Sequence, residues 1–187
     1  MTQATLLAKM ARLLESAGAP FMVVGSFSSS IHGQPRTTND LDLVVDFDSS
    51  SLSKFVSLLG DGFYVSPEAA HDALARRGMF NVIDFESGWK IDLIVLKNRL
   101  FSRSEFGRRR PAVIDGLEVP VATPEDVILS KLEWNLITPS RRQVEDARQV
   151  ALNHAGRLDL PYLRDWAEKL GISEALESVI SKAETNS

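Results

Sequence analysis

The chain has 187 residues, 44% of them hydrophobic and 25% charged, and this length allows either one mixed domain or a small catalytic domain with a helical appendage. A net charge of -4 argues against broad, non-specific binding of nucleic acid, and the lack of cysteine excludes a disulfide framework and zinc–cysteine sites. No apolar run is long enough to span a bilayer and the N-terminus lacks a signal sequence, so we expect a cytoplasmic protein with no membrane partner.

The first elements alternate between helix and strand. Apolar residues at helical spacing predict a helix over 4–17, which ends at Gly18. A short buried strand over 21–24 follows, and then a small-residue helix from about Ser26 to His32. A polar loop over 34–39 leads into an alternating strand over 40–45.

The middle of the chain predicts further helices and strands, and the end predicts helices only. Helices are expected over 49–59 and 67–77, and strands over 63–65, 79–85, 89–96, 112–114 and 117–121. From Thr123, which together with Pro124 predicts a strong helix start, the pattern is helical to the end. We therefore expect an α/β (α+β) domain over residues 1–122, with a helical region over 123–187 packed on it.

Two aspartates share one face of the strand over 40–45. Successive side chains of a strand point to opposite faces, so Asp40 and Asp42 lie together while Leu41 and Leu43 face the core. Paired carboxylates repel each other unless a cation lies between them, and Mg²⁺ prefers such oxygen ligands. A solvated strand face is the alternative interpretation.

A third acid, Asp92, repeats this pattern on a later strand. Its neighbours Ile91 and Leu93 face the opposite way, which again places an acid opposite a hydrophobic core. If the two strands pair, three carboxylates suit a two-metal site that clamps the attacking and leaving oxygens of an in-line displacement. Asp92 could also take the proton from an incoming hydroxyl.

Gly25 and Ser26 lie where a strand gives way to a helix. Glycine allows the backbone to approach a ligand closely, and free N–H groups at a helix N-terminus bind phosphate. An ordinary helix cap is the alternative, and the functional interpretation rests on their position directly upstream of the strand with Asp40 and Asp42.

Together these elements resemble the DNA polymerase beta-like nucleotidyltransferase superfamily. The family pattern is a Gly-Ser turn, a short helix, two acids alternating on a strand, and a third acid on a later strand. It matches Val24-Gly25-Ser26, the segment from Arg36 to Val44, and Ile91-Asp92-Leu93-Ile94, over roughly the first hundred residues. The resemblance implies a nucleotidyltransferase fold with a short mixed sheet flanked by helices.

The resemblance also implies a reaction and roles for single residues. A nucleoside monophosphate would pass from a nucleoside triphosphate (NTP) to an acceptor hydroxyl with release of pyrophosphate, assisted by Mg²⁺, as two ions. Asp40, Asp42 and Asp92 would be the catalytic, metal-binding acids. Gly25 and Ser26 would hold the triphosphate, and Arg36 would either bind phosphate or pair with a neighbouring acid.

The C-terminal part resembles the minimal nucleotidyltransferases of the abortive-infection branch, which are toxins of toxin–antitoxin pairs. The matching segments are the helix over 123–131 with Lys131, and the basic and acidic stretch over 141–146. Lys131 would reach the triphosphate and Asp146 would position a basic partner; the alternative is that both face solvent. An antitoxin protein is the partner that this resemblance implies.

The acceptor stays open at this stage. Arg103, the run over 108–110 and the pair over 141–142 favour a polyanion such as transfer RNA, whereas the acidic overall charge allows a cationic small molecule, and a protein hydroxyl is a third choice. A different class of function is a catalytically silent nucleotide-binding or interaction module on the same fold. The three intact acids argue against that alternative.

Overall fold

The structure is a computed structural model that describes residues 2–34 and 40–185. Its internal contacts divide the chain into two compact units. The first unit contains Met1–Val24 and Thr38–Val121, and the second contains Gly25–Thr37 and Ala122–Ser187. No helix in the described ranges has the length and apolar character that crossing a membrane would require.

A mixed sheet forms the centre of the first unit. Its strands, in the described residues, are β1 (Phe21–Val23), β2 (Asp40–Val45), β3 (Phe63–Tyr64), β4 (Met79–Asp84), β5 (Lys90–Val95), β6 (Arg110–Ile114) and β7 (Leu117–Val121). They lie in the order β3-β4-β5-β2-β1-β7-β6. The β2–β5 and β1–β7 pairs are parallel and the other pairs are antiparallel.

The helices of this unit begin and end at residues suited to those positions. They are α1 (Gln3–Ala17), α3 (Ser49–Leu59), α4 (Pro67–Arg76) and α5 (Leu100–Arg108), with a 3₁₀ turn over Gly60–Gly62. Thr2 caps α1, Asp48 forms a capping box with Ser51 at α3, and Ser66 caps α4. Gly18 ends α1 in the left-handed conformation, at a φ of 72°.

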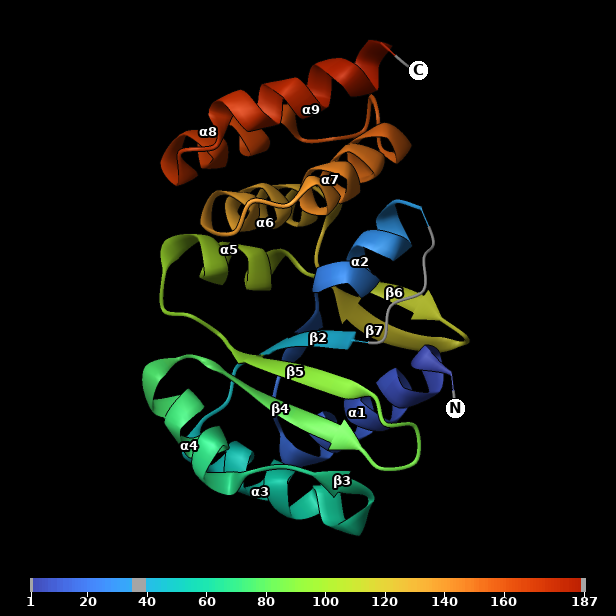
Figure 1. The fold of residues 1–187 in the computed structure, drawn as a ribbon, viewed down its shortest axis with the longest axis vertical. Helices are drawn as coiled ribbons and strands as arrows, with labels where there is room; N and C mark the ends of the chain where they lie inside the picture. The colour runs from blue at the N-terminus through green and yellow to red at the C-terminus, as the bar shows by residue number, and fades with distance from the viewer. Residues whose placement is uncertain (1, 35–39, 186–187) are drawn as a thin grey trace. The chain divides into compact units, whose positions relative to one another are not determined.

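The two faces of the central strands differ in composition. In β2, β4 and β5, every second residue is buried, as the alternation of a strand requires. Leu41, Leu43, Ile91 and Leu93 are fully buried, and α1 lies behind β4 and β5 in Figure 1. The opposite face carries most of the polar side chains of these strands; Asp84 at the end of β4 is the exception, because it has the buried parity.

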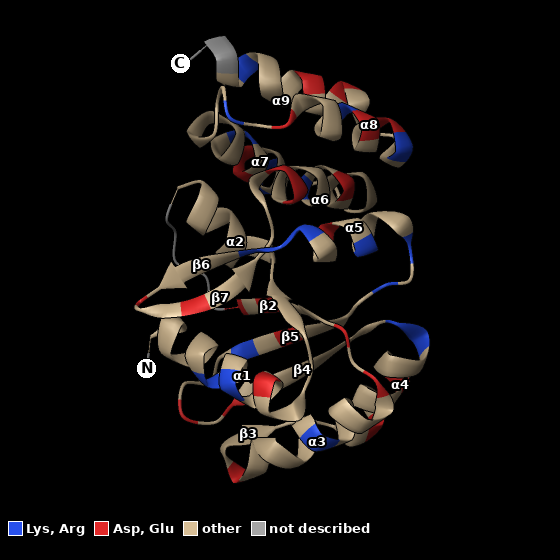
Figure 2. Cartoon of the chain, turned by 180° about the vertical axis from the view of Figure 1, so that it is seen from behind, with Lys and Arg blue, Asp and Glu red and all other residues tan. Residues whose placement is uncertain are grey.

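The second unit is helical. It contains α2 (Gly25–His32), α6 (Pro124–Ile137), α7 (Arg141–Asn153), α8 (Leu160–Leu170) and α9 (Ser173–Thr185). Helix α2 packs against α6 and α7, although it lies about ninety residues away from them in the sequence. Figure 2 shows acidic and basic residues interspersed along the helices of this unit.

The expected fold class is confirmed, because a mixed sheet flanked by helices is followed by C-terminal helices. One helix, α5, was not expected. Its buried residues are Phe101, Ser102, Glu105 and Phe106, so polar residues interrupt its buried face. An apolar stripe is the main signal of a helix in a sequence, and α5 lacks one.

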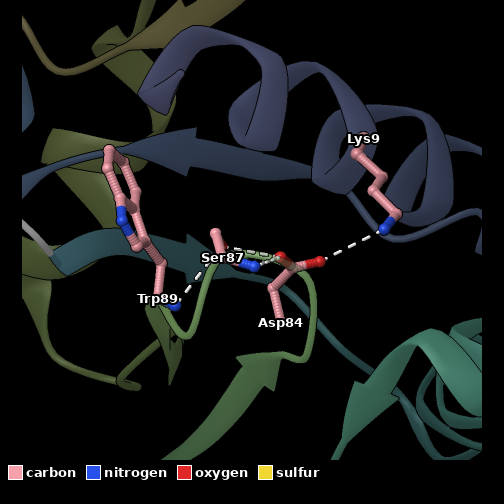
Figure 3. Close-up of polar contacts among 4 residues, drawn as sticks. All are labelled: Lys9, Asp84, Ser87 and Trp89. Carbon is pink, nitrogen blue, oxygen red and sulfur yellow. Dashed lines mark hydrogen bonds and ion pairs between the residues drawn. The ribbon is translucent and has the colours of Figure 1, made fainter. Parts of the chain in front are cut away.

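A buried carboxylate stabilises the turn between β4 and β5 (Figure 3). Asp84 is fully buried and accepts hydrogen bonds from the backbone N–H and the hydroxyl of Ser87, at 2.8 and 2.6 Å. Its other oxygen lies 3.2 Å from the ammonium of Lys9 on α1, which also lies over the ring of Phe63. These contacts tie the first helix to the hairpin that carries Asp92.

Candidate active site

The acids of the first unit meet on one face of the sheet. Strands β2 and β5 are parallel neighbours, and their register pairs Asp42 with Asp92 and Asp40 with Lys90. Residues paired across neighbouring strands point to the same face. The two strands are therefore adjacent, as the three-acid pattern required, and Asp40, Asp42, Lys90 and Asp92 share the face opposite the core; we call these four residues the acid face.

Exposure decreases across the acid face. Asp40 is exposed, Asp42 is half-buried, and Asp92 is only 7% exposed. A buried carboxylate is costly unless it is paired or hydrogen-bonded. The contacts of Asp92 therefore decide how the acid face is stabilised.

Both carboxylate oxygens of Asp92 have a partner. The ammonium of Lys90 lies 3.0 Å from Oδ2, and the side-chain amide of Asn81 donates a hydrogen bond to Oδ1. Asn81 is the register partner of Asp92 on β4, so it points to the same face. Three neighbouring strands thus contribute to one polar row: Asn81, Asp92 and Asp42.

Lys90 is the cation of the acid face. Its hydrogen bond to Asp92 raises its pKa, burial opposes that shift, and the negative charges of Asp92, Asp40 and Asp42 raise the pKa further. The ammonium therefore stays charged and faces all three acids. The sequence analysis did not identify Lys90 or Asn81, although both follow the strand parity that identified Asp92.

The acid face offers the oxygen ligands that Mg²⁺ prefers, supplied from adjacent strand positions. Within the described ranges, however, no three acidic or histidine side chains are already gathered as a ligand group. The carboxylate of Asp92 is bound to Lys90 and Asn81 instead. The residues fit a magnesium site in which Asp92 is shared with Lys90 or released from it.

Gly25 and Ser26 begin α2 in the second unit. Gly25 is the first helical residue and has a φ of 65°, a backbone conformation that residues other than glycine rarely adopt. Ser26 follows within the helix rather than preceding it as a cap. The residue before them, Val24, donates its backbone N–H to the carbonyl of Asp42 at 3.0 Å, so Gly25 directly follows a residue bonded to β2.

Lys131 lies on α6, also in the second unit. Its side chain is 7% exposed, and its ammonium lies 2.8 Å from a carboxylate oxygen of Asp146 on α7. Neither residue is thus a simple surface group. Arg36, the remaining residue assigned to the triphosphate, lies outside the described residues.

The chain is similar in fold to solved nucleotidyltransferases. The antibiotic-resistance factor ANT(2'')-Ia aligns at a TM-score of 0.60 and 17% identity, over 98% of this chain and 96% of that one. A nucleotidyltransferase-like protein from Paracoccidioides brasiliensis aligns at 0.55 and 18%, over 93% and 91%. The lincosamide antibiotic adenylyltransferase LnuA aligns at 0.51 and 14%, over 80% and 96%.

No protein-family model matches the sequence, and comparison with curated proteins gives no match. At these low identities the structural likeness shows the fold alone. The chain therefore shares its fold with solved nucleotidyltransferases, which is the fold that the sequence resemblance implied.

Proposed function

We propose that the protein is a Mg²⁺-dependent nucleotidyltransferase that moves a nucleoside monophosphate from an NTP to an acceptor hydroxyl. The observation that carries this proposal is the pairing of Asp42 with Asp92 across β2 and β5, with Asp40 on the same face. Three carboxylates on one sheet face repel each other, which is energetically costly. A hard cation such as Mg²⁺ relieves this repulsion and can also bind the phosphates of a nucleotide. The solved ANT(2'')-Ia in complex with adenylyl-2''-tobramycin shares the fold.

Asp40, Asp42 and Asp92 would hold the metal, which supplies charge neutralisation for the phosphates and polarises the reacting oxygens. The acceptor oxygen would form a bond to the α-phosphorus while the bond to pyrophosphate breaks. Asp92 would take the hydroxyl proton; Asn81 and Lys90 orient its carboxylate, and one of these contacts would have to open for an oxygen to accept that proton. Pyrophosphate then leaves with the displaced electron pair.

Gly25, Ser26, Arg36 and Lys131 are proposed to contact the triphosphate. Support comes from the left-handed backbone of Gly25 at a helix start, where free N–H groups favour phosphate. For Lys131 it comes from the sequence resemblance, and in the structure its buried ammonium lies 2.8 Å from a carboxylate oxygen of Asp146.

The acceptor is proposed to be a small molecule, transfer RNA or a protein hydroxyl. Two proteins with a similar fold have been solved with antibiotics. ANT(2'')-Ia was solved with adenylyl-2''-tobramycin, and LnuA was solved with lincomycin. Resemblance to the abortive-infection branch points instead to a toxin with an antitoxin partner. The arginines that would serve a polyanion are partly engaged, because Arg103 pairs with Asp46 at 3.3 Å.

Label transfer tests the proposal. The protein is incubated with each α-labelled NTP, Mg²⁺, and in turn transfer RNA, tobramycin, lincomycin and the protein alone. We expect metal-dependent labelling of one acceptor, and a loss of about 100-fold or more in Asp42→Asn, because that change removes a metal ligand.

The matched control is Asp46→Asn, the same substitution one residue beyond the end of β2. Asp46 lies four residues from Asp42, about 13 Å along the strand direction, and it pairs with Arg103. This variant should transfer label as the wild type does. Nucleotide binding without transfer to any acceptor would instead favour the silent nucleotide-binding module, for which the engagement of Asp92 by Lys90 is the supporting observation.

A further inference from the structure

Lys90 is the one basic residue in the described strands β2, β4 and β5. It lies two residues before Asp92 on the same strand face, and its register partner on β2 is Asp40. Its ammonium is 3.0 Å from Oδ2 of Asp92, while 45% of its side chain remains exposed. A partly exposed cation therefore contacts Asp92 and lies close enough to Asp40 and Asp42 to feel their charge.

The position of this cation conflicts with that of a metal ion. A metal that takes Asp92 as a ligand must share or displace the oxygen that Lys90 binds, because Asn81 holds the other oxygen. Even a lysine that moves aside stays tethered to β5 within a few ångströms of the acids. Its positive charge then repels the ion, and it weakens the attraction of the three carboxylates for that ion.

We propose that Lys90 is a built-in counter-cation that opposes metal binding until the nucleotide arrives. It neutralises part of the acid face in the free protein and keeps Asp92 oriented. Metal then binds firmly only with the triphosphate, whose negative charges offset the lysine. This inference rests on the proposed function, because it assigns Lys90 a regulatory role at the same metal site.

The test measures Mn²⁺ binding to the free protein by electron paramagnetic resonance, without nucleotide or turnover. Removing the charge with Lys90→Met should tighten Mn²⁺ binding by about tenfold, from the Coulomb repulsion between a unit charge and a divalent ion a few ångströms apart. Lys90→Arg keeps the charge and should bind Mn²⁺ as the wild type does. A gain of affinity for Mn²⁺ is a useful readout, because a substitution that only damaged the structure would weaken Mn²⁺ binding.

Lys54→Met is the matched control. Lys54 is exposed on α3, a helix that packs against α1 and α4, so this variant makes the same change in net charge away from the acids. It should leave the affinity for Mn²⁺ unchanged. With a non-hydrolysable triphosphate analogue present, the difference in Mn²⁺ affinity between Lys90→Met and the wild type should become smaller.

Two results would overturn the inference, and they can be told apart. Equal affinity in wild type, Lys90→Met and Lys90→Gln, with binding abolished by Asp42→Asn, would reject the role of Lys90 and keep the metal site. Mn²⁺ binding that Asp42→Asn leaves unchanged would reject the metal site itself, and the inference with it. The second neutral variant, Lys90→Gln, decides the matter if Lys90→Met does not fold.

Discussion

At the residue scale, the surroundings of a charged side chain determine whether it can be buried. Asp92 can remain a buried carboxylate because Lys90 and Asn81 satisfy both of its oxygens. Asp42, its register partner, is half-buried and therefore more open to solvent than Asp92. Two aspartates paired across neighbouring strands thus differ in burial, and Asp92 is the more buried of the two.

Two histidines of the second unit show the same dependence on surroundings. The ring of His32 is hydrogen-bonded to the carbonyl of Ala122 at 2.8 Å and lies 5.4 Å from the ring of His154. Burial lowers the pKa of His32, and burial together with the charges of His32 and Arg157 lowers the pKa of His154. Both rings therefore favour the neutral form more than they would in an unfolded chain.

This shift predicts a loss of stability in acid. The unfolded chain takes up protons near pH 6.5, before the folded histidines do, so the stabilising effect is present above that pH and is lost as the pH falls through the lowered pKa values. The melting temperature should fall between pH 7 and pH 5, and NMR titration should place both ring pKa values below 6.5. His154→Asn should reduce the pH dependence; an unchanged dependence would contradict the prediction.

At the scale of elements, the hairpin between β4 and β5 depends on one buried side chain. Burial raises the pKa of Asp84, but the hydroxyl and N–H of Ser87 and the ammonium of Lys9 outweigh burial and leave the pKa lowered. Asp84 is therefore charged in the folded protein at neutral pH. Its stabilising effect is present above the pKa of the unfolded chain and is lost as the pH falls through the folded value.

Replacing Asp84 tests this interaction. Asp84→Ala removes three interactions of a buried carboxylate and leaves the Ser87 turn and Lys9 without their partner. We expect the free energy of unfolding to fall by about 2–4 kcal/mol. Urea denaturation measures the change, with Asp61→Ala, an exposed acid in the same unit, as the control that stays near wild type.

The same hairpin shows which elements sequence patterns can identify. The strands around it were predicted because buried and exposed residues alternate, and the observed bounds differ by a residue or so at each end. Helix α5 was missed because Ser102 and Glu105 lie on its buried face. The contribution of Asn81 was missed too, because an asparagine on an exposed strand position gains meaning only from its register partner.

At the scale of the whole molecule, the contacts assign α2 to the C-terminal helices. The boundary near residue 122 was inferred from composition, which says nothing about which distant segment packs on the helices that follow. Helix α2 covers part of α6 and α7, and Asn153 on α7 donates a hydrogen bond to the carbonyl of Gly33 at 2.7 Å. The predicted division into domains 1–122 and 123–187 stays a prediction.

A fragment tests that division. The peptide over 123–187 lacks α2, so it exposes the surfaces of α6 and α7 on which α2 packs. We expect it to show reduced helicity by circular dichroism and a broad thermal transition, because a few short helices cannot bury enough apolar area alone. A fragment with full helicity and a cooperative melt would show that the C-terminal region is an independent domain.

The sequence by itself determined most of the elements, though not α5, and the parity of the acids, because strand alternation is local and repeats every two residues. It therefore identified Asp40, Asp42 and Asp92 as candidates and predicted the fold to which the solved nucleotidyltransferases are similar. Only the tertiary structure decided that Asp42 and Asp92 are register partners, and that Lys90 lies against Asp92. The alternating pattern excludes a slip of one residue, but it leaves open which residues pair across two strands about fifty residues apart, and tertiary packing decides that.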